Sequence, residues 1–331
     1  MFDTCAVIVT YADRWNFLAQ SIESAFVAGV SKVVVVDNGS GAQTQDGLAA
    51  AAVRFEGRLH LVRNEVNRGS AGGFKVGIET ALRCSDASHV WLLDDDNVPD
   101  VNALKKLCLA VNLLDGAGDV ILASYRPPLM AYLVKLAAGG RLAMRNNSFL
   151  GFHLADAFYK VKLRIFSRGA TAPIVAPILP LQISIYGGLF LHRDWVGRVG
   201  LPDERLFVYS DDTEYTKRLI DAGASIYLVT SSLINDVELS WYNDSRAGHR
   251  WMDPRANPQK VYLMVRNKAF VGRKWIKSLL FYRLNKYFLV CSLFVHSMIF
   301  EKNKSHMMRR FKLVLNAVRD GEKGDLSRNT L

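Results

Sequence analysis

Three consecutive aspartates, Asp94, Asp95 and Asp96, follow directly on the apolar run of residues 89–93. Carboxylates this close repel one another and are costly to bury unless a cation or hydrogen bonds compensate. One interpretation is an acidic turn that caps a following helix. The other is a site for Mg²⁺ or Mn²⁺, because these ions prefer hard oxygen ligands together with substrate phosphates. The strand-like run before the acids and the proline after them favour the metal site.

A second acidic cluster, Asp211 and Asp212 with Glu214 nearby, lies in "FVYSDDTEY". The alternative without chemistry is a helix N-terminus, where acidic side chains are stabilised by the helix dipole. Two acidic clusters on one sheet suggest instead a division of labour. One cluster would bind a metal ion, and the other would supply a general base.

Two weaker signals precede the Asp triplet. Asp37 ends the run "VVVVD" and either begins a simple turn or hydrogen-bonds a base or ribose. The segment "NRGSAGGF" is either a flexible loop or a place where backbone approaches a ligand, with Arg68 available for phosphate. It has neither the Walker pattern nor the GxGxxG spacing of dinucleotide-binding proteins.

Short β-branched runs alternate with helical patterns through the first part of the chain, which predicts an α/β fold with a parallel sheet and crossover helices. Ligands of such sheets bind beyond the carboxyl ends of the strands. Asp37, the glycine-rich segment and the Asp triplet should therefore converge on one crevice. The expected strands are "CAVIVTY", "SKVVVVDNGS", "LHLVRN" and "HVWLLDD", and the expected helices are Trp15 to Val27, "TQDGLAAAAVRF" and about Lys75 to Arg83.

The later chain is less regular. Residues 124–182 are irregular and rich in Pro, Arg and aromatic residues, whereas residues 182–229 again predict strand, helix, loop, helix and strand. The four cysteines are scattered without metal-ligand spacing, so reduced thiols in the cytosol are expected. No secretory signal is expected at the N-terminus. The apolar run 288–300 is too short to span a bilayer, which takes about 20 residues.

The net charge of +11 is concentrated at one end of the chain. Residues 260–331 hold 16 Lys and Arg against 4 Asp and Glu, whereas residues 1–259 hold 26 against 27. The C-terminal region predicts helices that carry apolar and basic residues together. They form either a helical subdomain with a solvated basic face or a surface for an anionic membrane. No nucleic-acid-binding motif is present, so a nucleic-acid partner is not expected.

Six motifs in this order make residues 3–270 resemble the family-two inverting glycosyltransferases of GT-A fold. The uninterrupted Asp triplet with the later Asp pair is most similar to the bacterial branch that includes galactofuranosyl- and rhamnosyl-transferases of surface polysaccharide. The resemblance implies a Rossmann-like, mostly parallel central sheet with flanking helices, here followed by the basic helical region. The motifs are "AVIVTYADR", "VVVVDNGS", "NRGSAGGFKVGIE", "WLLDDDNVPD", "GGLFLHRDWVGRVGLPDERLFVYSDDTEYTKRL" and "YLMVRNKAF".

The resemblance also implies residue roles. Asp212, beside Asp211, would be the base that deprotonates the acceptor hydroxyl. The nucleotide sugar would bind at Thr10, Tyr11, Asp37, Asn67, Arg68, Gly73, Asp94 and Asp95, the metal at Asp94 and Asp96, and the acceptor at Gly187, Gly188 and Trp241.

One feature departs from the family pattern. These enzymes often place a metal-ligating histidine some residues after the base, but here that window reads "LINDVELSW". His249, further on, and Asp236, within the window, are the two candidates for the missing ligand.

The sequence therefore predicts a glycosyltransferase that requires Mn²⁺ or Mg²⁺ and inverts the anomeric centre. It would move a hexosyl unit from a UDP- or dTDP-linked sugar to a glycan or lipid-linked glycan, at the cytoplasmic face of a bacterial membrane. The predicted domains are residues 1–259, divided at 123/124 into donor and acceptor halves, and residues 260–331. One alternative is a non-catalytic nucleotide-sugar-binding partner, which would need no base. The other is a nucleotidyltransferase. Such an enzyme would have a basic glycine-rich loop near its N-terminus, and the segment "VTYADRWN" does not contain one.

Overall fold

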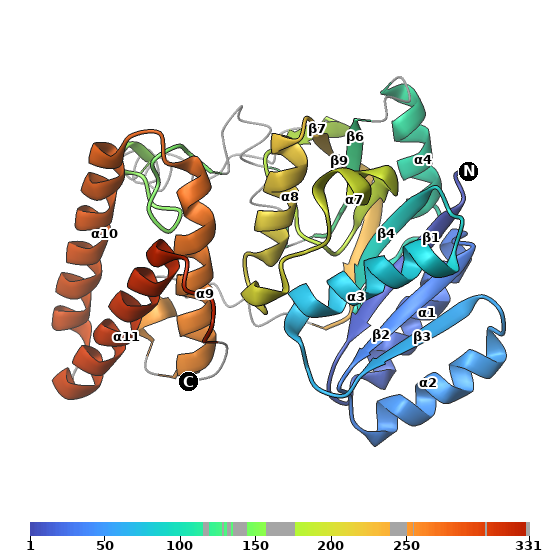
Figure 1. The fold of residues 1–331 in the computed structure, drawn as a ribbon, viewed down its shortest axis with the longest axis horizontal. Helices are drawn as coiled ribbons and strands as arrows, with labels where there is room; N and C mark the ends of the chain where they lie inside the picture. Colours follow the sequence, from blue (N-terminus) through green and yellow to red (C-terminus); the bar gives the residue numbers. More distant parts are fainter. Residues whose placement is uncertain are drawn as a thin grey trace, which may run out of the picture. The chain divides into compact units, whose positions relative to one another are not determined.

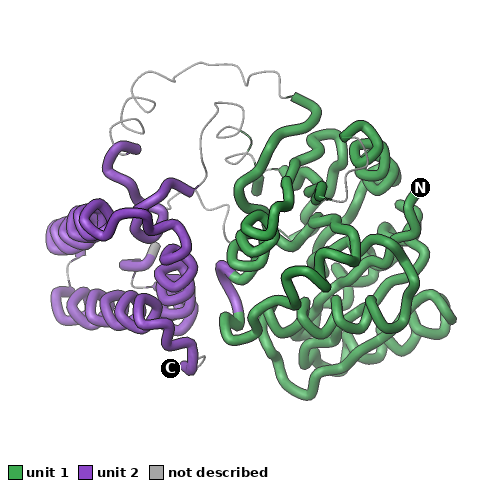
Figure 2. The backbone as a smooth tube through the Cα atoms, turned by 45° about the horizontal axis from the view of Figure 1, so that its top comes forward, with its two compact units in different colours: residues 1–143, 175–207, 211–243 green, residues 144–174, 208–210, 244–331 purple. Residues whose placement is uncertain are grey.

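A computed structural model describes the chain as two compact units (Figure 2). Unit 1 comprises residues 1–143, 175–207 and 211–243, and unit 2 comprises residues 144–174, 208–210 and 244–331. The predicted boundary at residue 259/260 therefore falls inside unit 2. The residues that the structure describes are 1–114, 119–127, 129–130, 134, 144–156, 176–238, 250–253, 255–301 and 303–328.

The first half of unit 1 is the predicted parallel sheet (Figure 1). Its valine-rich strands are buried on both faces, as parallel strands covered by helices require. β1 pairs in parallel with β2 and β4, and β2 pairs in parallel with β3. The elements are β1 (Thr4–Thr10), α1 (Trp15–Ala28), β2 (Lys32–Asn38), α2 (Ala42–Arg54), β3 (Leu59–Asn64), α3 (Gly69–Cys84) and β4 (His89–Asp94).

The second half makes the sheet mixed. β8 (Leu189–His192) runs antiparallel between β4 and β6 (Val120–Tyr125). β6 is parallel to β9 (Ser225–Asp236), which also pairs antiparallel with β5 (Asn97–Pro99) and β7 (Ile178–Leu181). The strand order is β3-β2-β1-β4-β8-β6-β9-β5, with β7 on β9.

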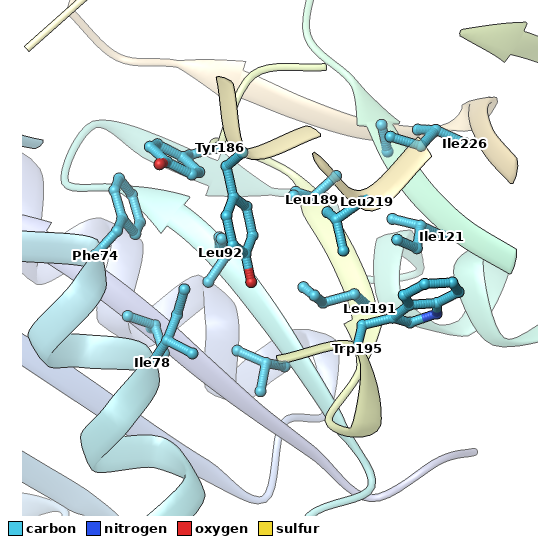
Figure 3. Packing of buried hydrophobic residues seen from close by; sticks show 14 of the residues in the cluster. Phe74, Ile78, Leu92, Ile121, Tyr186, Leu189, Leu191, Trp195, Leu219 and Ile226 are labelled. Atoms are coloured by element: carbon cyan, nitrogen blue, oxygen red, sulfur yellow. The ribbon is translucent and has the colours of Figure 1, made fainter. Parts of the chain in front are cut away.

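Hydrophobic clusters cover both faces of this sheet. Phe74 and Ile78 of α3 pack on one face with Leu219 of α8 (Asp211–Asp221) and Trp195 of α7 (Asp194–Val199) (Figure 3). α1 and α4 (Ala103–Leu113) bury their apolar residues on the other face. Between α7 and α8 lies the short 3₁₀ helix η1 (Glu204–Leu206). The sheet is therefore rigidly enclosed, and its strand ends can position a site.

The glycine-rich segment is the start of α3 and not a loop. We expected the helix to begin near Lys75, but it begins at Gly69. A Cβ at Gly73 would lie 2.5 Å from Val9, and a Cβ at Gly77 would lie 2.4 Å from Val7. These glycines let α3 approach the sheet closely, so packing overrides their poor helix propensity.

Unit 2 consists largely of helices: η3 (Arg250–Met252), α9 (Pro258–Gly272), η4 (Arg273–Trp275), α10 (Leu279–Phe300) and α11 (Lys304–Lys323). α9 and α11 pack together, and the side-chain amide of Asn257 caps the N-terminus of α9. Glu322 of α11 accepts hydrogen bonds from Tyr282 and Lys286 of α10. Within the described residues, none of the helices is long and apolar enough to cross a membrane.

Candidate active site

Polar residues lie together at the carboxyl ends of neighbouring parallel strands, as the sequence predicts. The strand register places Thr10 at the end of β1 beside Asp37 of β2, and Asp94 at the end of β4 beside Val9. Because the strands are parallel, their carboxyl ends lie at the same end of the sheet. The site is therefore built on the ends of the most deeply buried strands of the protein.

The three aspartates of the triplet point in different directions. Asp95 is buried, and Arg14 binds both of its carboxylate oxygens at 2.8 and 2.9 Å. The hydroxyl of Thr10 donates a further hydrogen bond to Asp95 at 2.8 Å. Asp94 and Asp96 are only half-buried, and they bond other partners, Arg126 and Asn97. Both carboxylate oxygens of Asp95 therefore have protein partners, whereas Asp94 and Asp96 stay partly exposed to solvent.

Asp94 shares a buried arginine with Asp236. Arg126, directly after β6, donates from Nη1 to Asp94 at 2.7 Å and from Nε to Asp236 at 2.9 Å. The amide of Asn97 donates to Asp236 at 3.0 Å and to Asp96 at 3.1 Å. Three carboxylates thus gather around one guanidinium and one amide. We call these five residues the acid–arginine cluster.

Gly187 is part of the wall of this cluster. A Cβ at Gly187 would lie 1.9 Å from Nη1 of Arg126 and 2.6 Å from carboxyl Oδ2 of Asp94. It would also lie 2.6 Å from Oδ1 of Asn97. The next residue, Gly188, has φ +96° and hydrogen-bonds through its backbone N–H to the Leu92 carbonyl at 2.7 Å. The resemblance places both glycines at the acceptor, which stays a prediction, and Gly187 lies beside Asp94, a residue predicted to bind donor and metal.

The second acid pair opens helix α8. Asp211 is buried and accepts a hydrogen bond from the Ser70 hydroxyl at 2.7 Å. Asp212 is half-buried, and its Oδ1 accepts from the backbone N–H of Thr213 at 2.6 Å. Just before the pair, Phe207 has a positive φ of 63°. Backbone strain of this kind is often found at functional sites. Of the two acids, Asp212 is the one that solvent and a substrate can reach.

Electrostatics connects the two acidic groups. Burial raises the pKa values of Asp211 and Asp212, and the charge of Asp94 also raises that of Asp212. Burial, followed by the charge of Asp94, raises the pKa of Asp96 to about 7. Since Asp94 influences both groups, the Asp triplet and the Asp pair belong to one electrostatic neighbourhood.

The predicted nucleotide residues lie at the same edge of the sheet. Asp37 is buried, and its Oδ1 accepts bonds from the backbone N–H and hydroxyl of Ser40 at 2.7 and 2.5 Å. The Tyr11 ring is 49% exposed and lies beside the Arg14 guanidinium. An exposed ring next to a buried carboxylate suits a nucleobase. The role of these residues in donor binding stays a prediction.

The residues of the glycine-rich segment contact protein. Oδ1 of Asn67 accepts a hydrogen bond from the backbone N–H of Gly69 at 2.8 Å, and Arg68 forms an ion pair with Glu204. Gly73 faces Val9, as described above. A phosphate could therefore recruit Arg68 only in competition with Glu204.

Two predicted residues, Trp241 and His249, lie outside the described residues. Asp236, the other candidate for a further metal ligand, lies within the acid–arginine cluster.

The carboxylates suit a divalent cation in their chemistry. Mg²⁺ and Mn²⁺ bound to a diphosphate take only one or two protein carboxylates, a requirement that the half-buried Asp94 and Asp96 meet. The observation that supports this fit is Arg126, because the acids already surround a positive charge. As the described residues are arranged, no three His, Cys, Asp or Glu side chains form a metal-binding group.

Sequence reasoning missed Arg126, Asn97 and Arg14 as site residues. Arg126 follows the apolar strand "VILASY", and a charge directly after a buried strand was the same signal that identified Asp94. Asn97 is fully buried, and its amide bonds two carboxylates, contacts that no local pattern indicates.

Comparison with known proteins shows what this chain is similar to in sequence and in fold. Residues 5–145 match the family model described as glycosyl transferase family 2. A relative is the galactofuranosyltransferase GlfT1 of Mycolicibacterium smegmatis, 28% identical over 295 residues, which cover 86% of this chain and 89% of GlfT1.

Two solved structures share the fold. The mannosyltransferase PcManGT of Pyrobaculum calidifontis, in complex with GDP-Man and Mn²⁺, has a TM-score of 0.53 at 14% identity, covering 97% of this chain and 89% of that one. TarS 1–349 of S. aureus has a TM-score of 0.53 at 13% identity, covering 98% and 82%. At these identities the likeness concerns the fold alone.

Proposed function

We propose that the chain, which matches the family-two glycosyltransferase model over residues 5–145, transfers a hexosyl residue with inversion and with the aid of a divalent cation. The donor would be a UDP- or dTDP-linked sugar, with galactofuranose favoured over rhamnose. The acceptor would be a glycan or lipid-linked glycan of a bacterial surface polysaccharide. The observation that carries the proposal is the arrangement of the half-buried Asp94 and Asp96 at the strand ends, where they gather around Arg126 and Asn97.

Inversion needs one base and one stabilised leaving group. Asp212 would accept the proton of the acceptor hydroxyl while that oxygen forms a bond to the anomeric carbon. The bond from this carbon to the diphosphate oxygen breaks in the same displacement. A carboxylate whose pKa is raised by burial is a stronger base than an exposed one, so Asp212 suits this task.

The leaving diphosphate would depart on the side of Asp94 and Asp96. A cation bound there would supply the positive charge that stabilises the diphosphate. Arg14 keeps Asp95 away from this side, so the two outer carboxylates alone face the ligand. Asp211, held by Ser70, would fix the first turn of α8 and thereby orient Asp212.

The preference for galactofuranose rests on the named relative GlfT1, a galactofuranosyltransferase. A panel of nucleotide sugars, including UDP-galactofuranose and dTDP-rhamnose, tests this part of the proposal through product formation on a lipid-linked disaccharide acceptor.

The base assignment is tested by Asp212→Asn in the full chain. We expect transfer to fall by about 10²–10⁴-fold, the usual contribution of a general base, while the affinity for UDP measured by calorimetry stays within a factor of about three. The matched control is Asp221→Asn at the other end of α8, where Asp221 is 54% exposed and pairs with Lys217. Turnover of Asp212→Asn at the rate of Asp221→Asn would refute the assignment.

We further propose that α10 contacts the surface of an anionic membrane. One face of this helix buries Tyr282, Leu289 and Leu293, while the opposite face exposes large apolar side chains to solvent. The region that contains it is strongly basic, which suits lipid headgroups of negative charge. The exposed apolar residues of α10 are Leu279, Leu280, Phe281, Leu284, Tyr287, Phe288, Phe294, Val295, Met298 and Ile299.

Vesicle sedimentation tests this contact. The double variant Leu284→Ser, Val295→Ser should bind vesicles of phosphatidylglycerol and phosphatidylcholine about tenfold or more weakly than the wild type, because two apolar side chains leave the contact. Leu113→Ser on α4 is the control, since Leu113 is an exposed leucine of unit 1 at 77% exposure. Equal binding of the double variant and the wild type would exclude α10 as the contact.

A further inference from the structure

Arg126 occupies the centre of the acid–arginine cluster as a resident cation. Its side chain is only 6% exposed, and it contacts Asp94 and Asp236 with all three guanidinium nitrogens. Nη1 bonds Asp94 at 2.7 Å, whereas Nε and Nη2 bond Oδ1 of Asp236 at 2.9 and 2.8 Å. Such charge-assisted bonds are strong, particularly where water is excluded.

We propose that Arg126 competes with the divalent cation for Asp94, so that the cation gains this ligand only when Nη1 of Arg126 releases it. Two positive charges at the same carboxylate repel each other, and burial reduces the screening between them. The inference rests on the proposed metal-dependent transfer and names a residue that regulates metal binding at that site.

The cluster is arranged so that Asp94 can be released by itself. Arg126 keeps two bonds to Asp236 when the single bond from Nη1 to Asp94 breaks. Asp236 is held in turn by the amide of Asn97 at 3.0 Å. Asp94 is the most exposed partner, at 40%, against 12% for Asp236. A ligand that arrives from solvent therefore meets the carboxylate whose bond to Arg126 is the easier one to exchange.

The released Nη1 needs a new partner, because a buried guanidinium donor without one is costly. Gly187 closes one side, since a Cβ there would lie only 1.9 Å from Nη1. An oxygen of the donor diphosphate, brought in with the cation, would be such a partner. Cation and nucleoside diphosphate should therefore bind cooperatively, and each should tighten the other by the same factor.

The test measures Mn²⁺ binding directly, by the electron paramagnetic resonance signal of free Mn²⁺, with and without UDP. Without UDP, R126Q should bind Mn²⁺ at least about tenfold more tightly than the wild type, because the competing charge is gone. UDP should tighten Mn²⁺ binding in the wild type more than in R126Q. The matched control is R198Q, which removes an arginine that is 52% exposed and pairs with Asp119. It should behave as the wild type.

The outcomes separate this inference from the proposed function. Mn²⁺ binding by the wild type with equal or weaker binding by R126Q would overturn the competition and leave metal-dependent transfer standing. Absence of Mn²⁺ binding in both proteins, even with UDP, would overturn metal dependence as well as the competition.

A second measurement follows Arg126 in the wild-type protein and needs the conservative variant R126K only to assign the resonance. The Nε–H resonance of Arg126, assigned by its absence in R126K, should shift when Mg²⁺ and UDP are added together. If this resonance stays unchanged at saturating Mg²⁺ and UDP, then Arg126 does not exchange partners and the inference is wrong.

Discussion

Gly187→Ala offers the sharpest test of the acid–arginine cluster, because a single methyl group is added at its centre. The new Cβ would lie 1.9 Å from Nη1 of Arg126 and 2.6 Å from carboxylate and amide oxygens of Asp94 and Asn97. None of these atoms can move freely. Arg126 and Asn97 are buried, and each is bonded to Asp236.

The expected losses of stability and of transfer rate follow from how far the atoms around Gly187 must shift. Ordinary carbon–nitrogen contacts need well over 3 Å, so Nη1 has to move by more than an ångström. Overpacking of this kind costs about 1–3 kcal/mol of folding free energy. A displacement of about 1 Å in a reacting site can lower the rate about 100-fold. The free energy of unfolding of Gly187→Ala should therefore be about 2 kcal/mol lower than that of the wild type, and its transfer rate about one hundredth.

Urea unfolding and initial rates of transfer measure the two effects, with Gly197→Ala as the control. Gly197 lies in α7, and a Cβ there would meet no atom within 4 Å. Alanine at this helical position should stabilise the protein by about 0.4–1 kcal/mol. If Gly187→Ala matched Gly197→Ala in stability and turnover, the close approach of Gly187 to Arg126 and Asp94 would be refuted.

Three further predictions concern charges. Arg14→Met leaves the buried carboxylate of Asp95 without its main partner and should cost about 3 kcal/mol in urea unfolding, and Asp95→Asn in the same chain should recover part of it. Burial raises the pKa of Asp212 above the ordinary value of 3.8, so the transfer rate should fall as the pH decreases, with a midpoint above 3.8. A midpoint of this fall at or below 3.8 would contradict the raised pKa. Burial, and next the nearby His192, lower the pKa of His89 to about 4, so between pH 6.5 and 4 the unfolded chain binds a proton that the folded chain does not. As the pH falls from 6.5 to 4, the wild type should lose unfolding free energy relative to His89→Phe. Parallel curves of unfolding free energy against pH for the two proteins would contradict the prediction.

The first four strands could be predicted from the sequence because their apolar runs are continuous and their helices have regular lengths. The parallel pairing of β1 with β2 and β4, and of β2 with β3, then follows from the helical crossover connections. The place of β8 could not be predicted in this way, since an antiparallel strand inserted between β4 and β6 depends on a long-range pairing. No local pattern encodes such a pairing.

The start of α3 was missed for a related reason. Glycine is a poor helix former by itself, so "GSAGGF" predicts a loop. In the folded protein, the absence of side chains at Gly73 and Gly77 allows α3 to lie directly against Val9 and Val7. Tertiary packing therefore reverses the local preference, and a ligand-binding role is no longer needed to explain these glycines.

The same limit applies to the site. Asp94, Asp96 and Asp212 could be identified because each follows or begins an element with a clear pattern. Arg126 comes from the start of the irregular region 124–182, and its partners Asp94 and Asp236 are 32 and 110 residues away in the chain. Contacts between residues so far apart arise from the fold and leave no spacing that a sequence pattern can show.

The Asp triplet illustrates how the fold makes three adjacent charges tolerable. β4 ends at Asp94, and Asp95 and Asp96 form a turn in which Asp95 bonds Arg14 while Asp96 bonds the amide of Asn97. Arg14 neutralises Asp95 on one side, and Arg126 lies against Asp94 on the other. Asp95 and Asp94 are therefore each paired with an arginine, but the two ion pairs differ in their geometry. The Arg14 pair is bidentate and completed by Thr10, whereas Arg126 holds Asp94 by one bond and keeps Asp236 by two. The first arrangement is suited to hold the strand end in place, and the second is suited to exchange its cation for a ligand.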